Sequence, residues 1–305
     1  MKKVSIITVN FNQPKVTEEL LQSIPDSYTN IEIIVVDNGS KVEADNSWMS
    51  KFPHINFIRS EQNLGFAGGN NRGVNEATGD YLFFVNNDTE FTEGLLEKLV
   101  EVMNSKPAIG MISPMIKYYS DKSLIQYAGY TPMNYYTCRN SCIGLREKDT
   151  GQFNNITAPT AYCHGAAMMV KKAAIEKAGL MSENFFLYYE EVDWCEQIKR
   201  AGYEAWVCTE ALIYHKESVS VGKKSKLKEY FMNRNRILFT RRNAPFFNKL
   251  IFYPYFILLV VPRNLLAYIK NKNYDFIPML LKAVWWNFTH NKNSKNLGYP
   301  INSIK

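Results

Sequence analysis

The sequence predicts an α/β fold in which a mostly parallel sheet is flanked by helices. Over the first 215 residues, short apolar runs rich in β-branched residues alternate with helical patterns, as in βαβ units. Two of these runs, residues 31–36 and 81–85, end abruptly in polar residues that include Asp37 and Asp88. Because ligands of such sheets bind outside the carboxyl ends of the strands, these acids predict a shared polar ligand, a metal-bound nucleotide.

The first half of the chain contains four strand patterns, each followed by a helical or turn pattern. The expected strands are residues 4–9, 31–36, 55–59 and 81–85, and the expected helices are 14–23, 42–51, a segment ending near Ala77, and 92–104. Pro14 suits the first position of its helix. The helix at 92–104 places five apolar side chains on one face: Leu95, Leu96, Leu99, Val100 and Met103.

The second half resumes the alternation after an insertion. Residues 109–116 form an expected strand, and residues 117–160, rich in Tyr, Ser, Thr and Asn, are expected to carry short strands near the acceptor side of the substrate edge. A strand at 161–170 and a helix at 172–178, ended by Gly179, follow. A helix at 190–201 precedes two short strands, 205–208 and 211–214, which lead to His215.

Charge and cysteine content limit the class of protein. The net charge of +7 is uneven, because residues 216–305 hold 17 Lys and Arg against three Asp and Glu. Such a tail indicates an anionic partner. The five cysteines form no close CxxC pair, so we expect reduced thiols in a cytoplasmic protein. Residues 4–9 are too short for a signal peptide.

Residues for a nucleotide pocket follow the first strands. A carboxylate at Asp37 can accept the imide N–H of uracil or thymine, although capping of the next helix explains it equally well. The segment 63–71 reads as a glycine-rich loop before a helix, which permits close approach of phosphate. It lacks both the P-loop pattern and the GxGxxG spacing, so alone it is a weak phosphate signal.

A metal site is expected where two strands end. Asn86, Asn87 and Asp88 offer amide and carboxylate oxygens, which Mg²⁺ and Mn²⁺ prefer. His215 ends the last core strand, and its imidazole can complete the set of metal ligands. Each residue alone has a simpler interpretation, a turn aspartate or a hydrogen-bonding histidine.

A general base is expected among three acids at a helix start, namely Glu190, Glu191 and Asp193. The helix dipole explains part of this clustering, since acids at a helix N-terminus each stabilise by roughly 0.3–1 kcal/mol. Adjacent like charges also raise one pKa, which suits a base. The aromatic run at 185–189 can exclude water from it.

These motifs together resemble the inverting family 2 glycosyltransferases of the GT-A fold, in particular the bacterial rhamnosyltransferase-like branch that builds surface polysaccharides. The resemblance covers residues 3 to about 242. It is carried by six segments in the family's order, namely residues 4–12, 35–40, 63–70, 86–88, 189–193 and 214–215.

The resemblance implies a role for each segment. Val9, Asn10 and Asp37 would hold the base of a nucleotide-sugar donor, and Phe66, Gly68 and Asn70 would line the nucleotide and diphosphate. Asn86 and Asn87 would contact the donor, and Asp88 and His215 would bind the metal, Mn²⁺ or Mg²⁺. Glu191 would be the catalytic base, beside Glu190, and Asp193 would support the base or the acceptor.

Three positions depart from the family pattern. Asn86 stands where the first aspartate of the DxD motif is expected, Glu191 where many relatives have Asp, and Gln197 where an arginine is usual. The implied reaction is one direct displacement that inverts the anomeric carbon. The expected donor is dTDP-L-rhamnose and the acceptor a lipid-linked glycan. A UDP-linked hexose or N-acetylhexosamine, or a non-catalytic nucleotide-sugar-binding protein, is the alternative.

The expected domains are a GT-A catalytic domain at 1–242 and an amphipathic helical segment at 243–305. The apolar run at 250–261 contains Pro254 and is shorter than the roughly 20 residues of a membrane span. Basic residues interleaved with Trp and Phe favour a helix lying on an anionic membrane, at the inner face of the cell membrane, over nucleic-acid binding. Packing on the catalytic domain or in a homodimer is the alternative.

Overall fold

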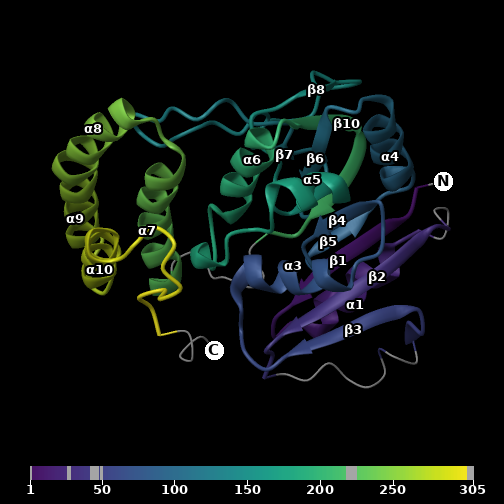
Figure 1. Ribbon diagram of the computed structural model, residues 1–305, viewed down its shortest axis with the longest axis horizontal. Helices are drawn as coiled ribbons and strands as arrows, with labels where there is room; N and C mark the ends of the chain where they lie inside the picture. Colours follow the sequence, from purple (N-terminus) through teal and green to yellow (C-terminus); the bar gives the residue numbers. More distant parts are fainter. Residues whose placement is uncertain (1, 26–28, 42–47, 49–50, 218–224, 301–305) are drawn as a thin grey trace.

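A ten-stranded sheet forms the centre of the protein in a computed structural model that describes residues 2–25, 29–41, 48, 51–217 and 225–300. The main strand order is β3-β2-β1-β4-β9-β6-β10-β5, with β7 beside β6 and β8 beside β10. Helices flank the sheet, and a separate group of helices, α7 to α10, lies to one side of it (Figure 1). The predicted α/β class is confirmed.

The first four strands are parallel and match the predicted ranges closely. They are β1 (Val4–Asn10), β2 (Ile31–Asn38), β3 (Ile55–Ser60) and β4 (Tyr81–Val85). Helix α1 (Pro14–Ser23) begins at its proline, as expected. The helix expected at 42–51 falls largely outside the described residues. Strands β1 and β2 pair in parallel up to Asn10 and Asp37. The polar residues at their carboxyl ends therefore lie side by side at the same edge of the sheet.

The glycine-rich segment is the start of a helix, which corrects the prediction of a loop at 63–69. Helix α3 (Gly65–Glu76) includes these glycines because they let it approach the sheet closely. A Cβ atom at Gly69 would lie 2.9 Å from Val9 Cγ1, and one at Gly73 would lie 2.5 Å from Ile7 Cγ2. The glycines therefore serve helix–sheet packing.

The second half of the sheet is mixed. Strand β9 (Ala167–Lys171) lies antiparallel between β4 and β6 (Ile109–Tyr118), and β10 (Glu204–His215) is parallel to β6. The predicted strand at 161–170 therefore begins late, because a turn closed by the Ala167 N–H and the His164 carbonyl precedes it. The two strands predicted at 205–214 are one strand, whose pairing with β6 shifts between Cys208 and Leu212.

Short elements complete the sheet and its cover. These are β5 (Thr89–Phe91), β7 (Ile125–Tyr127), β8 (Thr157–Pro159), α4 (Leu95–Ser105), α5 (Lys172–Ala178) and α6 (Glu190–Arg200). Strand β5 was not expected from the sequence, whereas short strands within 117–160 were, and β7 and β8 confirm them. All five cysteines are free thiols.

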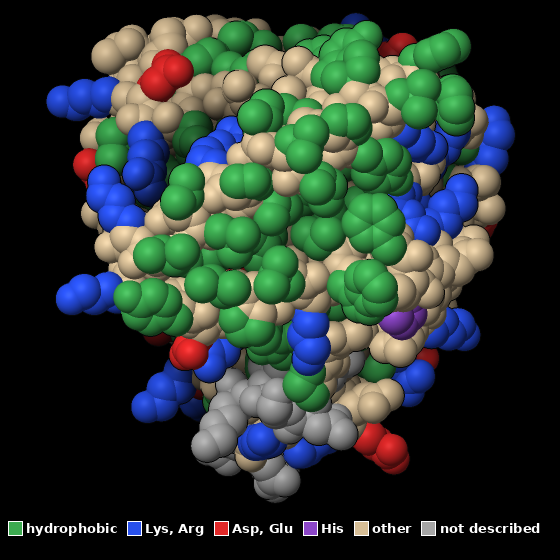
Figure 2. Space-filling model, turned by 90° about the vertical axis from the view of Figure 1, so that its left-hand side faces the viewer, with side chains coloured by type: hydrophobic (Ala, Val, Ile, Leu, Met, Phe, Trp, Pro, Cys, Tyr) green, Lys and Arg blue, Asp and Glu red, His purple; other side chains and the backbone are tan. Residues whose placement is uncertain are grey.

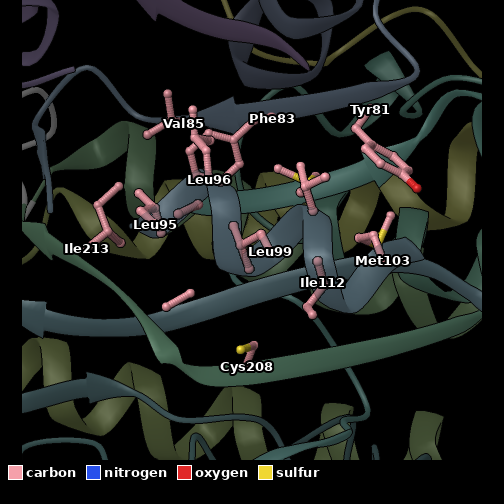
Figure 3. Close-up of a cluster of buried hydrophobic side chains, with 14 of the residues drawn as sticks. Tyr81, Phe83, Val85, Leu95, Leu96, Leu99, Met103, Ile112, Cys208 and Ile213 are labelled. Carbon is pink, nitrogen blue, oxygen red and sulfur yellow. The ribbon is translucent and has the colours of Figure 1, made fainter. Parts of the chain in front are cut away.

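One apolar cluster joins α4 to the sheet. Figure 3 shows Leu95, Leu96, Leu99 and Met103 of α4 beside Phe83 and neighbouring strand residues, all buried. This is the face that the apolar spacing predicts, and it covers the sheet behind the ends of β4 and β10. The cluster therefore supports β4, which leads to Asp88, and β10, which ends at His215.

The C-terminal part is helical, as expected, and its helices extend on both sides of the apolar run at 250–261. It comprises α7 (Lys226–Asn243), α8 (Phe246–Tyr255), a π-helical turn η2 (Phe256–Val260), α9 (Val261–Lys270) and α10 (Phe276–Thr289). The π turn follows Pro254, which has no N–H for the normal helical bond. Helix α7 packs mainly on α10 and also contacts α6, so the division at 242 stays a prediction.

Residues 246–270 form a continuous helix of 25 residues, which corrects the expectation of a run too short to span. By length and composition alone this helix could cross a membrane, with a mean hydropathy of 1.7 over its most apolar window. Only 17% of that window is buried within the protein. The helix is therefore largely uncovered by the rest of the chain that the structure describes.

We expect Leu99→Ala to destabilise the fold by roughly 2–5 kcal/mol, because it removes a fully buried side chain from the α4 cluster and leaves a cavity. Urea unfolding followed by circular dichroism measures the change. The neighbouring exposed variant Glu101→Ala is the control and should shift stability by less than about 1 kcal/mol. Equal effects of both variants would contradict the proposed packing.

Candidate active site

A cavity of about 650 Å³ lies at the carboxyl ends of β1, β2, β4 and β10. Its wall includes residues directly after each of these strands or at their last positions, such as Phe11, Asn38, Asn86 and His215. The loop before α6, the start of α7 and Tyr299 close the other side. A cavity at this edge is where an α/β sheet places its ligand.

Seven of the predicted site residues line this cavity, namely Val9, Phe66, Asn70, Asn86, Asn87, Asp88 and His215. The other six lie outside its lining, namely Asn10, Asp37, Gly68, Glu190, Glu191 and Asp193. Gly68 is buried within α3, where a Cβ would lie 2.6 Å from Leu64 Cβ. The structure therefore brings the predicted metal pair and part of the predicted nucleotide pocket together.

Asn10 and Asp37 lie buried behind the Val9 part of the wall. The Asn10 Nδ2 donates to Asp37 Oδ1 (2.9 Å), and the Thr17 hydroxyl donates to Asn10 Oδ1 (3.0 Å). The second oxygen, Asp37 Oδ2, is buried without a hydrogen bond from any described residue, and Arg59 Nε lies 3.7 Å from it. A buried carboxylate oxygen without a donor is costly, so this position favours a ligand that supplies one.

The Asp88 and His215 side chains form a close, buried pair. The His215 Nδ1 lies 2.8 Å from Gln126 Oε1, and its Nε2 lies 3.1 Å from Asp88 Oδ1. Because an amide oxygen only accepts, Nδ1 carries the proton, and Nε2 of a neutral ring presents a lone pair to the carboxylate. Two acceptors at this distance require a proton or a cation between them.

A divalent cation fits this pair. Neighbouring ligands of an octahedral Mg²⁺, each about 2.0–2.1 Å from the ion, lie about 3 Å apart. Gln126 fixes the orientation of the His215 ring by a hydrogen bond to Nδ1. Metal-bound histidines commonly have such a partner on the nitrogen that does not bind the metal. Among the described residues, no group of three or more His, Cys, Asp and Glu gathers at one point. A cation here would therefore need oxygen atoms from a ligand or water.

The three predicted acids of α6 have different environments. Glu190 is buried with one oxygen unpartnered among the described residues, and burial, with the charge of Glu191, raises its pKa well above its usual range. Glu191 is half-buried, and burial raises its pKa as well. Its Cγ lies 3.4 Å from the Cβ position of Gly165, the residue after cavity-lining His164.

Asp193 is fully buried in a network that joins α6 to α7. Its carboxylate accepts from Arg242 Nε (3.0 Å) and Nη2 (3.1 Å), from Asn243 Nδ2 (2.7 Å) and from Gln197 Nε2 (2.8 Å). Gln197, where the family pattern has arginine, thus contacts the acid directly, while Arg242 supplies the cation. The catalytic part predicted for Asp193 stays a prediction, and its contacts are those of a positioning residue.

The loop before α6 is held in an unusual backbone conformation. Phe186, Tyr188 and Tyr189 all have positive φ angles, 65°, 70° and 73°. Asn235 of α7 holds this loop, because its Nδ2 donates to the carbonyls of Phe185, Leu187 and Tyr188 at 2.8–2.9 Å. Such strain clusters at functional sites, and here it places Phe186, Leu187 and Tyr188 in the cavity wall.

Several residues of the cavity wall were not predicted from the sequence. Gln126 and His164 carry no local signal, since each becomes informative only beside a partner distant in the chain. Burial, and then the charge of His215, lowers the pKa of His164 to about 3, so its ring is neutral near pH 7. The aromatic run at 185–189 was the one available signal for the opposite wall.

Comparison with known proteins agrees with this geometry. A family model described as Glycosyl transferase family 2 matches residues 5–179. A low-salt glycan biosynthesis hexosyltransferase of Haloferax volcanii is 29% identical over 241 residues, which cover 77% of this chain and 74% of that protein. The N-acetylglucosaminyl-diphospho-decaprenol L-rhamnosyltransferase of Mycobacterium tuberculosis is 21% identical over 213 residues, 63% of this chain and 69% of that protein.

A solved structure shares the fold. The mannosyltransferase from Pyrobaculum calidifontis, in complex with GDP-Man and Mn²⁺, superposes with a TM-score of 0.56. The match covers 95% of this chain and 76% of that one at 15% sequence identity. At that identity the likeness concerns the fold alone, and it agrees with the arrangement of the mixed sheet.

We expect Glu190→Gln to weaken the pH dependence of stability. Burial, with the charge of Glu191, raises the pKa of Glu190 above its ordinary value of 4.5, so its contribution to stability is complete below that value and is lost as pH rises through the folded pKa. Wild-type stability should therefore fall as pH rises above 4.5, by at most about 1.4 kcal/mol per pH unit from this one group. Urea unfolding at each pH measures the slope.

The exposed variant Glu147→Gln is the control for this experiment and should retain the wild-type slope. An unchanged slope for Glu190→Gln would show that the folded state ionises Glu190 as readily as the unfolded chain does.

Proposed function

We propose a donor, an acceptor and a mechanism for this chain, which belongs to glycosyl transferase family 2. It is a glycosyltransferase with the GT-A fold. On this proposal it transfers one sugar, L-rhamnose from dTDP-L-rhamnose, to a hydroxyl group of a lipid-linked surface glycan. The name of the mycobacterial relative supports rhamnose, while the name of the haloarchaeal one supports a hexose, so a UDP-linked hexose or N-acetylhexosamine is the alternative donor.

The observation that carries the proposal is the Asp88–His215 pair in the cavity wall. Glu191 lies beside Gly165, the residue after cavity-lining His164. A nucleoside would lie along Val9, Asn38, Phe66 and Asn70, with its imide N–H directed toward Asp37 Oδ2, which accepts no hydrogen bond from a described residue. Its diphosphate would then extend toward Asn86, Asn87 and the Asp88–His215 pair. The predicted residues thus support one continuous donor path along the sheet edge.

Mn²⁺ or Mg²⁺ is the proposed cofactor, held by Asp88 and His215. When bound, it would neutralise charge on the departing nucleoside diphosphate. The chain's own contribution is to hold the two ligands about 3 Å apart, with Gln126 keeping the Nε2 lone pair directed at the site. Asn86 and Asn87 lie in the wall next to this pair and would contact the donor.

Glu191 is the proposed general base. It would take the proton of the acceptor hydroxyl as that oxygen bonds to the anomeric carbon and the bond from this carbon to the diphosphate oxygen breaks. Attack from the side opposite the diphosphate inverts the configuration. Its raised pKa makes the carboxylate a stronger proton acceptor than an exposed glutamate. Glu190 lies next to it, and the Asp193 network positions the helix that carries both.

We expect Glu191→Gln to lower kcat by at least about a hundredfold while retaining donor binding, because the amide keeps the shape and loses the base. The assay measures nucleoside diphosphate release from dTDP-L-rhamnose, UDP-glucose, UDP-galactose and UDP-N-acetylglucosamine with Mn²⁺ and a lipid-linked glycan acceptor. Asp88→Ala should lose metal-dependent turnover in the same assay. The exposed isosteric variant Glu147→Gln is the control.

Full turnover by Glu191→Gln would remove the base assignment. Turnover that needs no metal would remove the role proposed for Asp88.

The apolar face of α8, α9 and α10 supports membrane association at the cytoplasmic side. Figure 2 shows hydrophobic side chains gathered on this face with Lys and Arg around them. Side chains more than half exposed are Phe246, Phe247, Leu250, Ile251, Leu258, Leu259, Leu266, Ile269, Leu281, Trp285 and Phe288. An exposed apolar area of this extent marks an interaction surface.

Charge favours an anionic bilayer over a second copy of the chain. Residues 216–305 carry a net charge of +14, and each cation near an anionic lipid surface stabilises binding by about 1 kcal/mol. Two such tails facing each other would repel. A helix that lies in the interface, apolar side down, agrees with this distribution and with a lipid-linked acceptor.

We expect the triple variant Phe247→Ser, Leu258→Ser, Trp285→Ser to lose flotation with liposomes containing phosphatidylglycerol, because it removes exposed apolar area without touching buried side chains. Deletion of the tail is avoided, since Phe252, Phe256 and Trp286 lie in a buried cluster with α7.

The control for this experiment is Tyr136→Ser, Leu145→Ser, Leu180→Ser, three exposed apolar residues outside the C-terminal helices. It should float as the wild type does. Equal flotation of both triple variants would end the proposal of a membrane-binding face.

A further inference from the structure

His164 lines the cavity, and the mechanism above does not use it. It lies in the turn before β9, which is fixed from both sides. The Ala166 N–H donates to the His164 Nδ1 (3.1 Å), and the His164 N–H donates to the Ser113 hydroxyl (3.0 Å). That hydroxyl donates in turn to the Ala167 carbonyl (2.7 Å). The backbone of His164 is therefore held to β6.

The imidazole ring lies in an aromatic slot. It is parallel to the Tyr130 ring, with 2° between the planes and 6.1 Å between the centroids. The Tyr127 ring meets it edge-on at 5.3 Å, and the Tyr127 hydroxyl is itself held by the Tyr162 carbonyl (2.9 Å). These contacts leave the ring one orientation, which the Nδ1 hydrogen bond also requires.

The proton of the neutral ring is on Nε2, because Nδ1 accepts from a backbone N–H. No hydrogen bond joins Nε2 to another residue among 2–25, 29–41, 48, 51–217 and 225–300. This nitrogen is also not among the fully buried atoms that lack a partner, so part of it is accessible. His164 thus offers the cavity one fixed, neutral N–H donor. A donor held in place without a partner favours recognition of a ligand acceptor.

The position of this donor matches the transferred sugar. On one side the His164 ring lies 6.4 Å from the His215 ring, centroid to centroid, at the proposed diphosphate site. On the other side is the next residue, Gly165, where the Cγ of Glu191, the proposed base, lies 3.4 Å from the position that a Cβ would take. The sugar of a bound donor must lie between its diphosphate and the group that activates the acceptor.

We propose that His164 is a specificity-determining residue whose Nε2–H donates a hydrogen bond to a hydroxyl oxygen of the transferred sugar. This inference rests on the proposed glycosyl transfer. It also names a substrate class, a neutral sugar with a free hydroxyl group at the contacted position. A sugar carboxylate would meet an uncharged donor on the side of Glu191, whose own charge disfavours a further negative charge.

The test compares two binding constants for the full chain with Mn²⁺ by isothermal titration calorimetry. The probes are the nucleotide sugars dTDP-L-rhamnose and UDP-glucose, and the matching diphosphates dTDP and UDP. His164→Phe keeps a ring in the aromatic slot without the N–H, and His164→Gln restores a neutral donor. His54→Phe, an exposed histidine outside the cavity, is the matched control.

We expect His164→Phe to bind the nucleotide sugar about tenfold more weakly than wild type while binding the diphosphate equally well, as loss of one hydrogen bond predicts. His164→Gln should recover part of the loss. In a series of monodeoxy donors, the one that lacks the contacted hydroxyl should bind wild type and His164→Phe equally.

Equal affinity of wild type and His164→Phe for the nucleotide sugar would overturn the inference and leave the proposed function intact. A parallel loss for sugar and diphosphate ligands would also overturn it, since that result indicates a structural role in the fold. If the wild-type chain bound none of the nucleotide sugars or diphosphates, the proposed function would fail and this inference with it.

Discussion

The ion pair between Asp193 and Arg242 fixes the helix that carries the candidate base. Arg242 of α7 contacts both oxygens of a carboxylate that is fully buried in α6, and Asn243, Gln197 and Ser182 donate further hydrogen bonds to it. A buried carboxylate is stable only when paired in this way. Seven residues earlier on α7, Asn235 holds the strained loop before α6. The cavity wall on this side therefore depends on a helix outside the sheet.

This arrangement explains how three neighbouring acids acquire different properties. Asp193 is fully bonded and ties two helices together, Glu190 is buried with an unpartnered oxygen, and Glu191 is half-buried beside Gly165. Helical geometry directs Glu191 away from Glu190 and Asp193, because residues one and two apart do not share a face. Burial then raises the pKa of Glu190 and Glu191, whereas the cation of Arg242 compensates the charge of Asp193. One short acidic segment can thus supply both a proton acceptor and a structural anchor.

The same helical group turns an apolar face outward. Its inner side chains, such as Phe252 and Trp286, are buried against α7, and its outer ones remain exposed (Figure 2). Because α7 also holds the loop at 185–189, the surface proposed to bind lipid is joined through one helix to the wall of the cavity. The lipid-linked acceptor proposed above would use this connection between the proposed membrane-binding face and the cavity.

Local patterns in the sequence determined the strands and the polar residues at their ends, because strand formation and side-chain alternation depend on neighbours in the chain. For this reason β1, β2 and β4, and the positions of Asp37, Asp88 and His215, could be predicted. Only the tertiary structure decided the partners: Gln126 beside His215, Arg242 beside Asp193 and His164 at the cavity are each joined by contacts between distant residues. The glycines of α3 show the same limit, because their need for space arises from β1 and is absent from their own segment.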